Sequence, residues 1–379
     1  MVRRSVPGPD EVLAMVGRVD EQYRAVWNRL TVGDQIALAL YFLPHASSKA
    51  SLAPTRPRVA KWYCPFAHQS SLPTGHRYCI NVYSGCAHGC AYCYAMPYSS
   101  AEPHCKLRFA EMLAQDMQDL ERFDVPPAPV HMSNSTDPFQ TLEIQAGHAR
   151  VALEQVLAHR RRFTTVTILT KNPLLPVRSG YLDLFKALAD LPDDHRKGAD
   201  LCCQGLPAFC VEVSLAFWSE EARQAYDPSA PPIAARMEGI RAVRQAGIPV
   251  VLRIDPLLPR SPLRRQPLLS MAELGLVEAQ TLDDLEKLVC FAREVNARHV
   301  VYSPMKIVQP RGRPLSPAMR ALRGAYEAMA HPQKLVFRGG AWRLPDDIAR
   351  EQIVVPFLAI CRKHGVEAKF CMANLIETP

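Results

Sequence analysis

The sequence lacks any apolar run long enough to cross a lipid bilayer. Its longest run, residues 36–43, is far shorter than the roughly 20 residues that a membrane helix needs. The basic N-terminus, residues 1–7, is not followed by the apolar stretch of a secretory signal peptide. Internal repeats and low-complexity tracts are also absent. We therefore expect a cytoplasmic protein that makes no membrane contact.

A strong excess of one charge sign is missing as well. The 379 residues include 45 Lys and Arg and 37 Asp and Glu, which gives a net charge of +8. This mild basic bias permits an anionic partner but does not require one. Hydrophobic residues make up 48% of the chain and charged residues 22%, which is ordinary for a globular protein and argues against disorder.

Three parts of the chain differ in pattern. Residues 1–75 are predicted to form a helical extension and a linker, because apolar residues recur at helical spacing over residues 10–43. Residues 76–310 alternate β-branched runs with amphipathic helical stretches, which indicates βαβ units and a parallel sheet. Residues 311–379 are predicted to form a C-terminal α+β extension, with a short final strand near residues 368–371.

Six strands are predicted in the central part. Six parallel βα units make a partial or full barrel, whose functional site lies at the carboxyl ends of the strands. We therefore predict an α/β fold, a partial (β/α)6 TIM-like barrel. The predicted strands are Tyr78–Tyr83, Val130–Ser133, Val166–Thr170, Cys210–Ala216, Pro249–Asp255 and His299–Ser303.

The most informative segment is the cysteine loop, residues 81–94, which reads Asn-Val-Tyr-Ser-Gly-Cys-Ala-His-Gly-Cys-Ala-Tyr-Cys-Tyr. Its Cys86, Cys90 and Cys93 have the spacing Cys-x3-Cys-x2-Cys, and three such thiolates can bind three irons of a [4Fe–4S] cluster. The fourth iron then lacks a protein ligand and can bind a cofactor or substrate. Zinc is the alternative, with His88 between the cysteines, but zinc sites commonly use paired cysteines and no second pair follows closely.

The cysteine loop resembles the signature of the radical S-adenosylmethionine (radical SAM) superfamily. The wider sequence is similar to the branch related to spore photoproduct lyase, over about residues 78–305. Four further segments occur in the order found in that branch: Ser135-Thr136-Asp137-Pro138, Thr170-Lys171-Asn172-Pro173, Val213-Ser214 and Asp227-Pro228.

The resemblance implies a function and its cofactors. A [4Fe–4S] cluster would cleave S-adenosylmethionine (SAM) reductively, and the resulting 5′-deoxyadenosyl radical would take a hydrogen atom from a substrate. The electron would come from a donor such as flavodoxin or ferredoxin. The substrate stays open, with nucleic-acid repair and peptide or small-molecule modification as choices. A non-catalytic iron–sulfur or zinc binding module is the alternative from a different class.

The resemblance also implies roles for single residues. Tyr92 would flank the cofactor beside the cluster, and Ser135 and Thr136 would hydrogen-bond the polar end of SAM. Lys171 would meet the carboxylate of SAM as a cation. Ser214 would contact its ribose or carboxylate region.

One position departs from the family pattern. Where spore photoproduct lyase has a cysteine that returns a hydrogen atom to the product radical, this sequence has Asn134, whose amide cannot do so. Tyr94 matches the tyrosine of the same relay. We therefore do not expect thymine-dimer repair by the same route. Cys64, Cys79 and Cys105 flank the cysteine loop, and one of them could supply a thiol instead.

Two further groups of residues are candidates. Arginine forks bind phosphate and carboxylate, so arginines after the fifth and sixth predicted strands indicate an anionic substrate, nucleic acid among them. These are Arg260, Arg264, Arg265 and Arg311. A second cluster also stays open for five other cysteines, although their spacing matches no clear pattern. These are Cys202, Cys203, Cys210, Cys361 and Cys371.

Overall fold

The computed structural model describes residues 59–61, 78–96, 98–100, 102–122, 128–190, 207–308, 314–338 and 340–371. Several predictions fall outside these residues. They are the N-terminal helices of residues 10–43, the candidate arginine Arg311 and the cysteines Cys64, Cys202 and Cys203.

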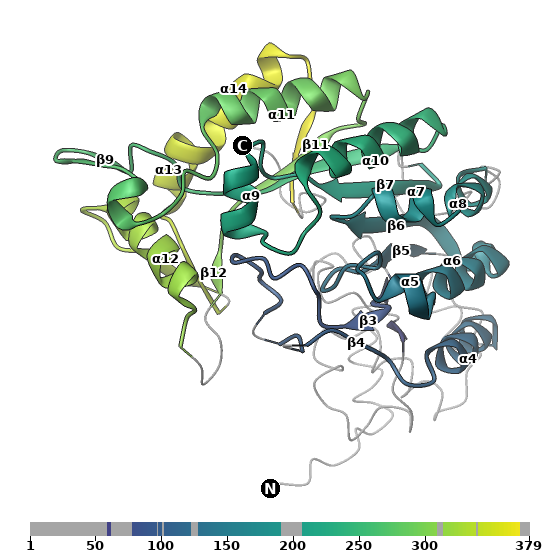
Figure 1. The fold of residues 1–379 in the computed structure, drawn as a ribbon. Coiled ribbons are helices and arrows are strands. Elements are labelled where there is room, and N and C mark those ends of the chain that lie inside the picture. The colour runs from purple at the N-terminus through teal and green to yellow at the C-terminus, as the bar shows by residue number, and fades with distance from the viewer. Residues whose placement is uncertain are drawn as a thin grey trace, which may run out of the picture.

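An eight-stranded sheet forms the centre of the molecule (Figure 1). The strands pair in the order β1-β2-β5-β6-β7-β8-β11-β15, and every pairing except that of β1 with β2 is parallel. The order is linear, so the sheet is an open, partial barrel, as predicted. The strands are β1 Ala60–Lys61, β2 Tyr78–Ile80, β5 Ala128–Met132, β6 Phe163–Thr170, β7 Phe209–Ser214, β8 Val250–Leu257, β11 Val300–Pro304 and β15 Ala368–Phe370.

All six strands predicted for the barrel are present, with two differences at its edges. The first is shorter than predicted, because the chain leaves the sheet after Ile80. It then forms β3 (Tyr83–Ser84), which pairs with β4 (His104–Cys105). The second difference is β15, near the end of the C-terminal extension, which pairs with β11 and adds a seventh parallel strand.

Helices connect the strands and cover the outside of the sheet (Figure 1). The predicted helical spacing is confirmed in α6, whose Ala149, Leu153 and Val156 are completely buried. Among the described residues, no helix is both long and apolar enough to span a membrane. The helices are α4 Phe109–Arg122, α5 Glu143–Ala146, α6 His148–Ala158, α7 Leu174–Arg178, α8 Leu182–Ala189, α9 Glu220–Tyr226, α10 Ile233–Gln245, α11 Leu282–Glu294, α12 Pro317–Ala330, α13 Asp346–Ile348 and α14 Val355–Lys363.

Two small sheets lie beside the main one, near α12 (Figure 1). Strands β9 (Arg264–Arg265) and β10 (Leu268–Leu269) form a hairpin that projects from the molecule. Strands β12 (Ile307–Val308), β14 (Ala341–Arg343) and β13 (Val336–Arg338) form an antiparallel sheet that directly follows β11. Both therefore extend from the carboxyl ends of barrel strands.

Helix α10 packs directly against the segment that follows β6. A Cβ atom added to Gly239 of α10 would lie 2.4 Å from the backbone nitrogen of Leu174 and 2.7 Å from the carbonyl carbon of Pro173. Real Cβ atoms do not come this close to backbone, so only glycine allows the contact. The contact fixes the turn that carries Lys171, two residues before Pro173.

We predict that Gly239→Ala lowers the free energy of unfolding by about 1–3 kcal/mol, the usual cost of overpacking. Gly324→Ala is the control, because its Cβ would meet nothing within 4 Å and alanine favours a helix interior by roughly 0.5–1 kcal/mol. Urea denaturation followed by circular dichroism measures both. Equal stability of the two variants would contradict the close packing of α10.

Candidate functional site

The cysteine loop follows β2 and curls at two glycines. Gly85 has φ of +77° and Gly89 has φ of +62°, a region that side-chain-bearing residues rarely adopt. A Cβ atom on Gly85 would also lie 2.8 Å from the carbonyl oxygen of Glu102. The amide of Cys93 donates to the carbonyl of Cys90 at 3.2 Å, which closes a turn between these two cysteines.

The three thiols of this loop are shielded from water and share one cationic neighbour. Cys90 is buried, and Cys86 and Cys93 are half-buried. Burial raises the pKa of all three, to about 12 for Cys86, whereas the ammonium of Lys171 acts on each thiol in the opposite direction. Thiolates are therefore costly here unless positive charge stands beside them.

This donor set fits an iron–sulfur cluster. One loop supplies three free thiols, and thiolate is the usual protein ligand of iron in such clusters. Metal charge would also relieve the cost of the buried thiolates, because iron binds the deprotonated sulfur.

A buried carboxylate after β5 fastens one side of the loop. Asp137 contacts Nε2 of His88 at 2.9 Å and accepts the Thr170 hydroxyl at 2.8 Å and the Lys171 amide at 2.6 Å. Gln140 accepts from the amide of Ala87 at 2.9 Å. His88, which lies inside the loop, is therefore held by the carboxylate of Asp137 from outside the loop. This contact gives His88 a structural partner.

The end of α9 and the segment that follows it fasten the other side of the loop. The amide of Ala91 donates to the carbonyl of Tyr226 at 2.8 Å, and the amide of Ser229 donates to the carbonyl of His88 at 3.2 Å. The guanidinium of Arg223 shapes this segment, since its Nη1 donates to the carbonyls of residues 227, 228 and 230. Two segments far apart in sequence thus hold the cysteine loop between them.

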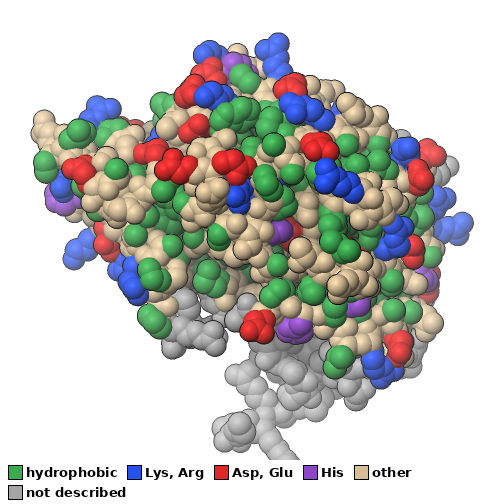
Figure 2. Space-filling view, viewed as in Figure 1, with side chains coloured by type: hydrophobic (Ala, Val, Ile, Leu, Met, Phe, Trp, Pro, Cys, Tyr) green, Lys and Arg blue, Asp and Glu red, His purple; other side chains and the backbone are tan. Residues whose placement is uncertain are grey.

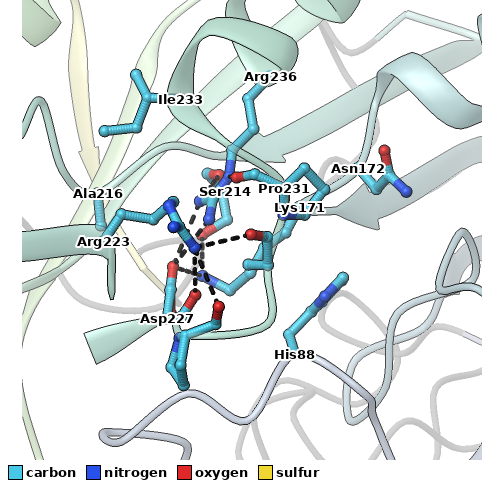
Figure 3. Close-up of polar contacts among 12 residues, drawn as sticks. His88, Lys171, Asn172, Ser214, Ala216, Arg223, Asp227, Pro231, Ile233 and Arg236 are labelled. Atoms are coloured by element: carbon cyan, nitrogen blue, oxygen red, sulfur yellow. Dashed lines mark hydrogen bonds and ion pairs between the residues drawn. The ribbon is translucent and has the colours of Figure 1, made fainter. Parts of the chain in front are cut away.

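Lys171 stands at the centre of a buried polar network (Figure 3). Its Nζ donates to the Tyr92 hydroxyl at 2.9 Å, to Ser214 Oγ at 2.9 Å and to Asp227 Oδ2 at 3.0 Å. An ammonium has three N–H donors, so these acceptors use all of them. The structure brings together three predicted cofactor residues, Tyr92, Lys171 and Ser214.

Asp227 joins this network to α10. Its carboxylate accepts the Tyr92 hydroxyl at 2.7 Å and the guanidinium of Arg236 at 3.3 Å. Burial alone would raise the pKa of Asp227, but Lys171 and Arg236 together hold that pKa well below its usual value. The carboxylate is 0% exposed and ionised, and its two cationic partners balance it.

The remaining predicted residues lie at the carboxyl ends of β2 and β5. The amide of Ser135 donates to the Asn81 side chain at 3.1 Å. Thr136 has a buried hydroxyl with no hydrogen-bond partner among the described residues. Tyr94 donates its hydroxyl to the backbone carbonyl of Asn134, and the Asn134 amide contacts the sulfur of Cys79 at 3.4 Å.

The candidate arginines are spread out. Arg260 follows β8 and donates to the backbone carbonyl of Gln352. Arg264 and Arg265 form strand β9 of the projecting hairpin. The described cysteines outside the loop are also separate: Cys210 contacts the Thr167 hydroxyl, Cys371 accepts from Arg253, and Cys361 lies in the hydrophobic core.

Sequence reasoning assigned no role to the residues that fasten the loop. Asp137 and Asp227 both belong to Asp-Pro pairs within the segments shared with the family, which was the only signal available. Gln140 had none. Arg236 lies on the buried face of α10, where a charged residue in an apolar pattern indicates a buried partner.

Comparisons with known proteins agree with this architecture. The structure aligns with spore photoproduct lyase complexed with dinucleoside spore photoproduct at a TM-score of 0.51, with 14% sequence identity and coverage of 84% of this chain and 81% of the other. A mutant of spore photoproduct lyase aligns at a TM-score of 0.50 with 14% identity, covering 83% of this chain and 80% of that one. The chain has the fold of spore photoproduct lyase.

Sequence comparison covers a smaller part of the chain than the structural alignments do. Uncharacterized proteins of Mycobacterium tuberculosis (strain H37Rv) and Mycobacterium bovis are 28% identical over 192 residues, which is 48% of this chain and 50% of each relative. The chain thus spans about half the length of the curated relatives it matches. No protein-family model matches the sequence.

We predict that Asp137→Asn lowers the free energy of unfolding by about 1–3 kcal/mol, because its NH2 group cannot accept from the donors that surround Asp137. Asp183→Asn is the control, since the Asp183 side chain is 99% exposed. Chemical denaturation of both variants measures the difference. If the two substitutions had equal effects, Asp137 would not be the anchor of the loop.

Proposed function

We propose that this chain is a radical SAM enzyme. Cys86, Cys90 and Cys93 would hold a [4Fe–4S] cluster with one iron open to SAM. When bound, the cluster and SAM together supply reductive cleavage of the sulfonium and a radical that takes hydrogen from the substrate. The observation that supports this most is a shielded trio of thiols on a glycine-curled loop at the carboxyl edge of the spore photoproduct lyase fold.

The residues around the loop suggest how SAM would be held. Thr136 offers a buried hydroxyl whose hydrogen bond is not made within the described protein, which suits the polar end of SAM together with Ser135. Tyr92 and Ser214 lie in the same region, because both accept a hydrogen bond from Lys171. Because the three protons of Lys171 are used by protein acceptors, Lys171 would attract the SAM carboxylate by charge or release one acceptor to meet it.

A thiol also lies beside Asn134, the position that departs from the family pattern. We retain Tyr94 and Asn134 as candidate catalytic residues, since they contact each other at the carboxyl end of β5. Cys79 contacts Asn134 and is buried, whereas Cys105 is exposed on β4. These positions favour Cys79 as the thiol that takes the place of the missing cysteine.

The proposed substrate is anionic, and nucleic acid is one candidate. Lys306 follows β11, where burial and the nearby Arg343 lower its pKa; burial and Arg338 in turn lower the pKa of Arg343. Like charges therefore lie close together beside the sheet, and the negative charge of Asp255 on β8 acts to raise the pKa of Lys306. Figure 2 shows Lys and Arg side chains at the edge of the molecule near α12.

An exposed aromatic residue accompanies these charges. Phe337 of β13 is 52% exposed, and the guanidinium of Arg323 lies 4.6 Å from the ring centre of the half-buried Trp342 on β14. Charge beside an exposed aromatic ring suits bases as well as phosphates. An electron donor such as flavodoxin or ferredoxin and a cytoplasmic location belong to the same proposal, because a reduced cluster needs both a reductant and a reducing compartment.

The first test is cofactor cleavage. Under anaerobic conditions with a strong reductant, the cluster-loaded protein is expected to convert SAM to 5′-deoxyadenosine or another SAM fragment, measured by liquid chromatography. Cys90→Ala should abolish the product, while Cys105→Ala, at an exposed cysteine outside the trio, should retain it. A full cluster with no SAM fragment would instead support the non-catalytic iron–sulfur module.

The second test concerns the substrate. We expect Arg264→Ser/Arg265→Ser to weaken binding of a fluorescent single-stranded DNA oligonucleotide. The slope of log affinity against log salt should fall by roughly 0.7 for each phosphate that the variant no longer neutralises. Arg160→Ser/Arg161→Ser, which changes two exposed arginines before β6, is the matched control. Unchanged affinity and slope in the hairpin variant would remove the hairpin from the binding site and leave peptide or small-molecule substrates.

A further inference from the structure

The buried network around Lys171 directs two cations at a single carboxylate. Asp227 supplies one carboxylate, whereas Lys171 and Arg236 supply two cations, and Figure 3 shows both directed at that carboxylate. The Arg236 side chain is only 1% exposed. Arg223 is paired separately, since its guanidinium contacts Glu220 at 2.5 Å. The second buried carboxylate, Asp137, contacts His88 on the other side of the loop, so fixed charges of both signs lie beside the cysteine loop.

The proposed cluster carries a net negative charge. Three thiolates outweigh the positive charge of the oxidised iron–sulfide core, and reduction adds a further electron. Net charge and nearby charges are among the factors that set the reduction potential of such clusters. In a buried site these charges are screened weakly, so a fixed cation close to the loop stabilises the reduced form.

Asp227 is the carboxylate of this network that lies close to a proposed cluster ligand, because it binds Tyr92 of the cysteine loop. Its carboxylate accepts the hydroxyl of Tyr92, two residues from Cys90, at 2.7 Å, and burial and the charge of Asp227 both raise the pKa of the Cys90 thiol. When Cys90 binds iron it loses its proton, and Asp227 then faces a thiolate. Lys171 and Arg236 offset this repulsion, because both contact Oδ2 of the same carboxylate at 3.0 and 3.3 Å.

We propose that Asp227 and Arg236 set the reduction potential of the cluster as a buried charge pair, with Arg236 acting through Asp227 and Lys171. This inference rests on the proposed function. Both are positioning residues. Arg236 also fastens α10, since it donates to the backbone carbonyls of Pro231 and Ser214, so its structural and electrostatic effects must be separated by experiment.

An anaerobic potentiometric titration, followed by electron paramagnetic resonance, measures the midpoint potential of the cluster. It separates the electrostatic effect of each substitution from its structural effect. Asp227→Asn, of the same shape, removes a negative charge and should shift the midpoint potential upward. Arg236→Gln removes a positive charge and should shift it downward. Arg236→Lys should return the potential toward the wild-type value. Arg241→Gln is the control on the same helix, because Arg241 is 43% exposed and pairs with Glu294; it should leave the potential unchanged.

Iron and sulfide contents are measured on every variant. Opposite shifts in Asp227→Asn and Arg236→Gln support the proposal, and if Arg236→Gln does not fold, the isosteric Asp227→Asn decides alone. Wild-type potentials in loaded variants overturn it, as does loss of the cluster from both, which would assign the network to folding of the loop. Failure of the wild-type protein to form a cubane would instead overturn the proposed function.

Discussion

Two buried carboxylates hold the cysteine loop in place, and the rest of the site depends on them. Asp137, after β5, accepts donors from the turn that carries Lys171 and contacts His88 inside the loop. Asp227, after α9, accepts from Tyr92 and Lys171. Each carboxylate is satisfied by several donors, which is what makes a buried charge tolerable. The loop would otherwise have few fixed contacts, since it contains no helix or long strand of its own.

The parallel sheet brings the residues of the site together at one edge, next to the cysteine loop. Parallel strands bring their carboxyl ends to one edge, so residues after β2, β5, β6 and β7 meet there although up to 135 positions separate them, as in the contact of Tyr92 with Asp227. Gly239 lets α10 approach the turn after β6, and the same helix carries Arg236 into the network. Packing and electrostatics therefore converge on Lys171.

The barrel strands and the cysteine loop left local signals in the sequence, whereas the roles expected of Tyr92, Lys171 and Ser214 came from the family resemblance and stay predictions. β-branched runs marked the strands, and the spacing of Cys86, Cys90 and Cys93 marked the loop. Partners that depend on long-range geometry left none. Nothing near Lys171 indicated that Tyr92, Ser214 and Asp227 would use all its protons, and nothing near residue 368 indicated that β15 would extend the sheet beside β11.

The central claim is that three thiols leave one iron of a cubane open to SAM. Mössbauer spectroscopy of protein loaded anaerobically with labelled iron, before and after addition of SAM, tests it most directly. The account predicts a [4Fe–4S] spectrum in which one iron differs from the other three and changes when SAM is added. A protein that retains only zinc, forms no cubane, or shows four equivalent irons indifferent to SAM would contradict it.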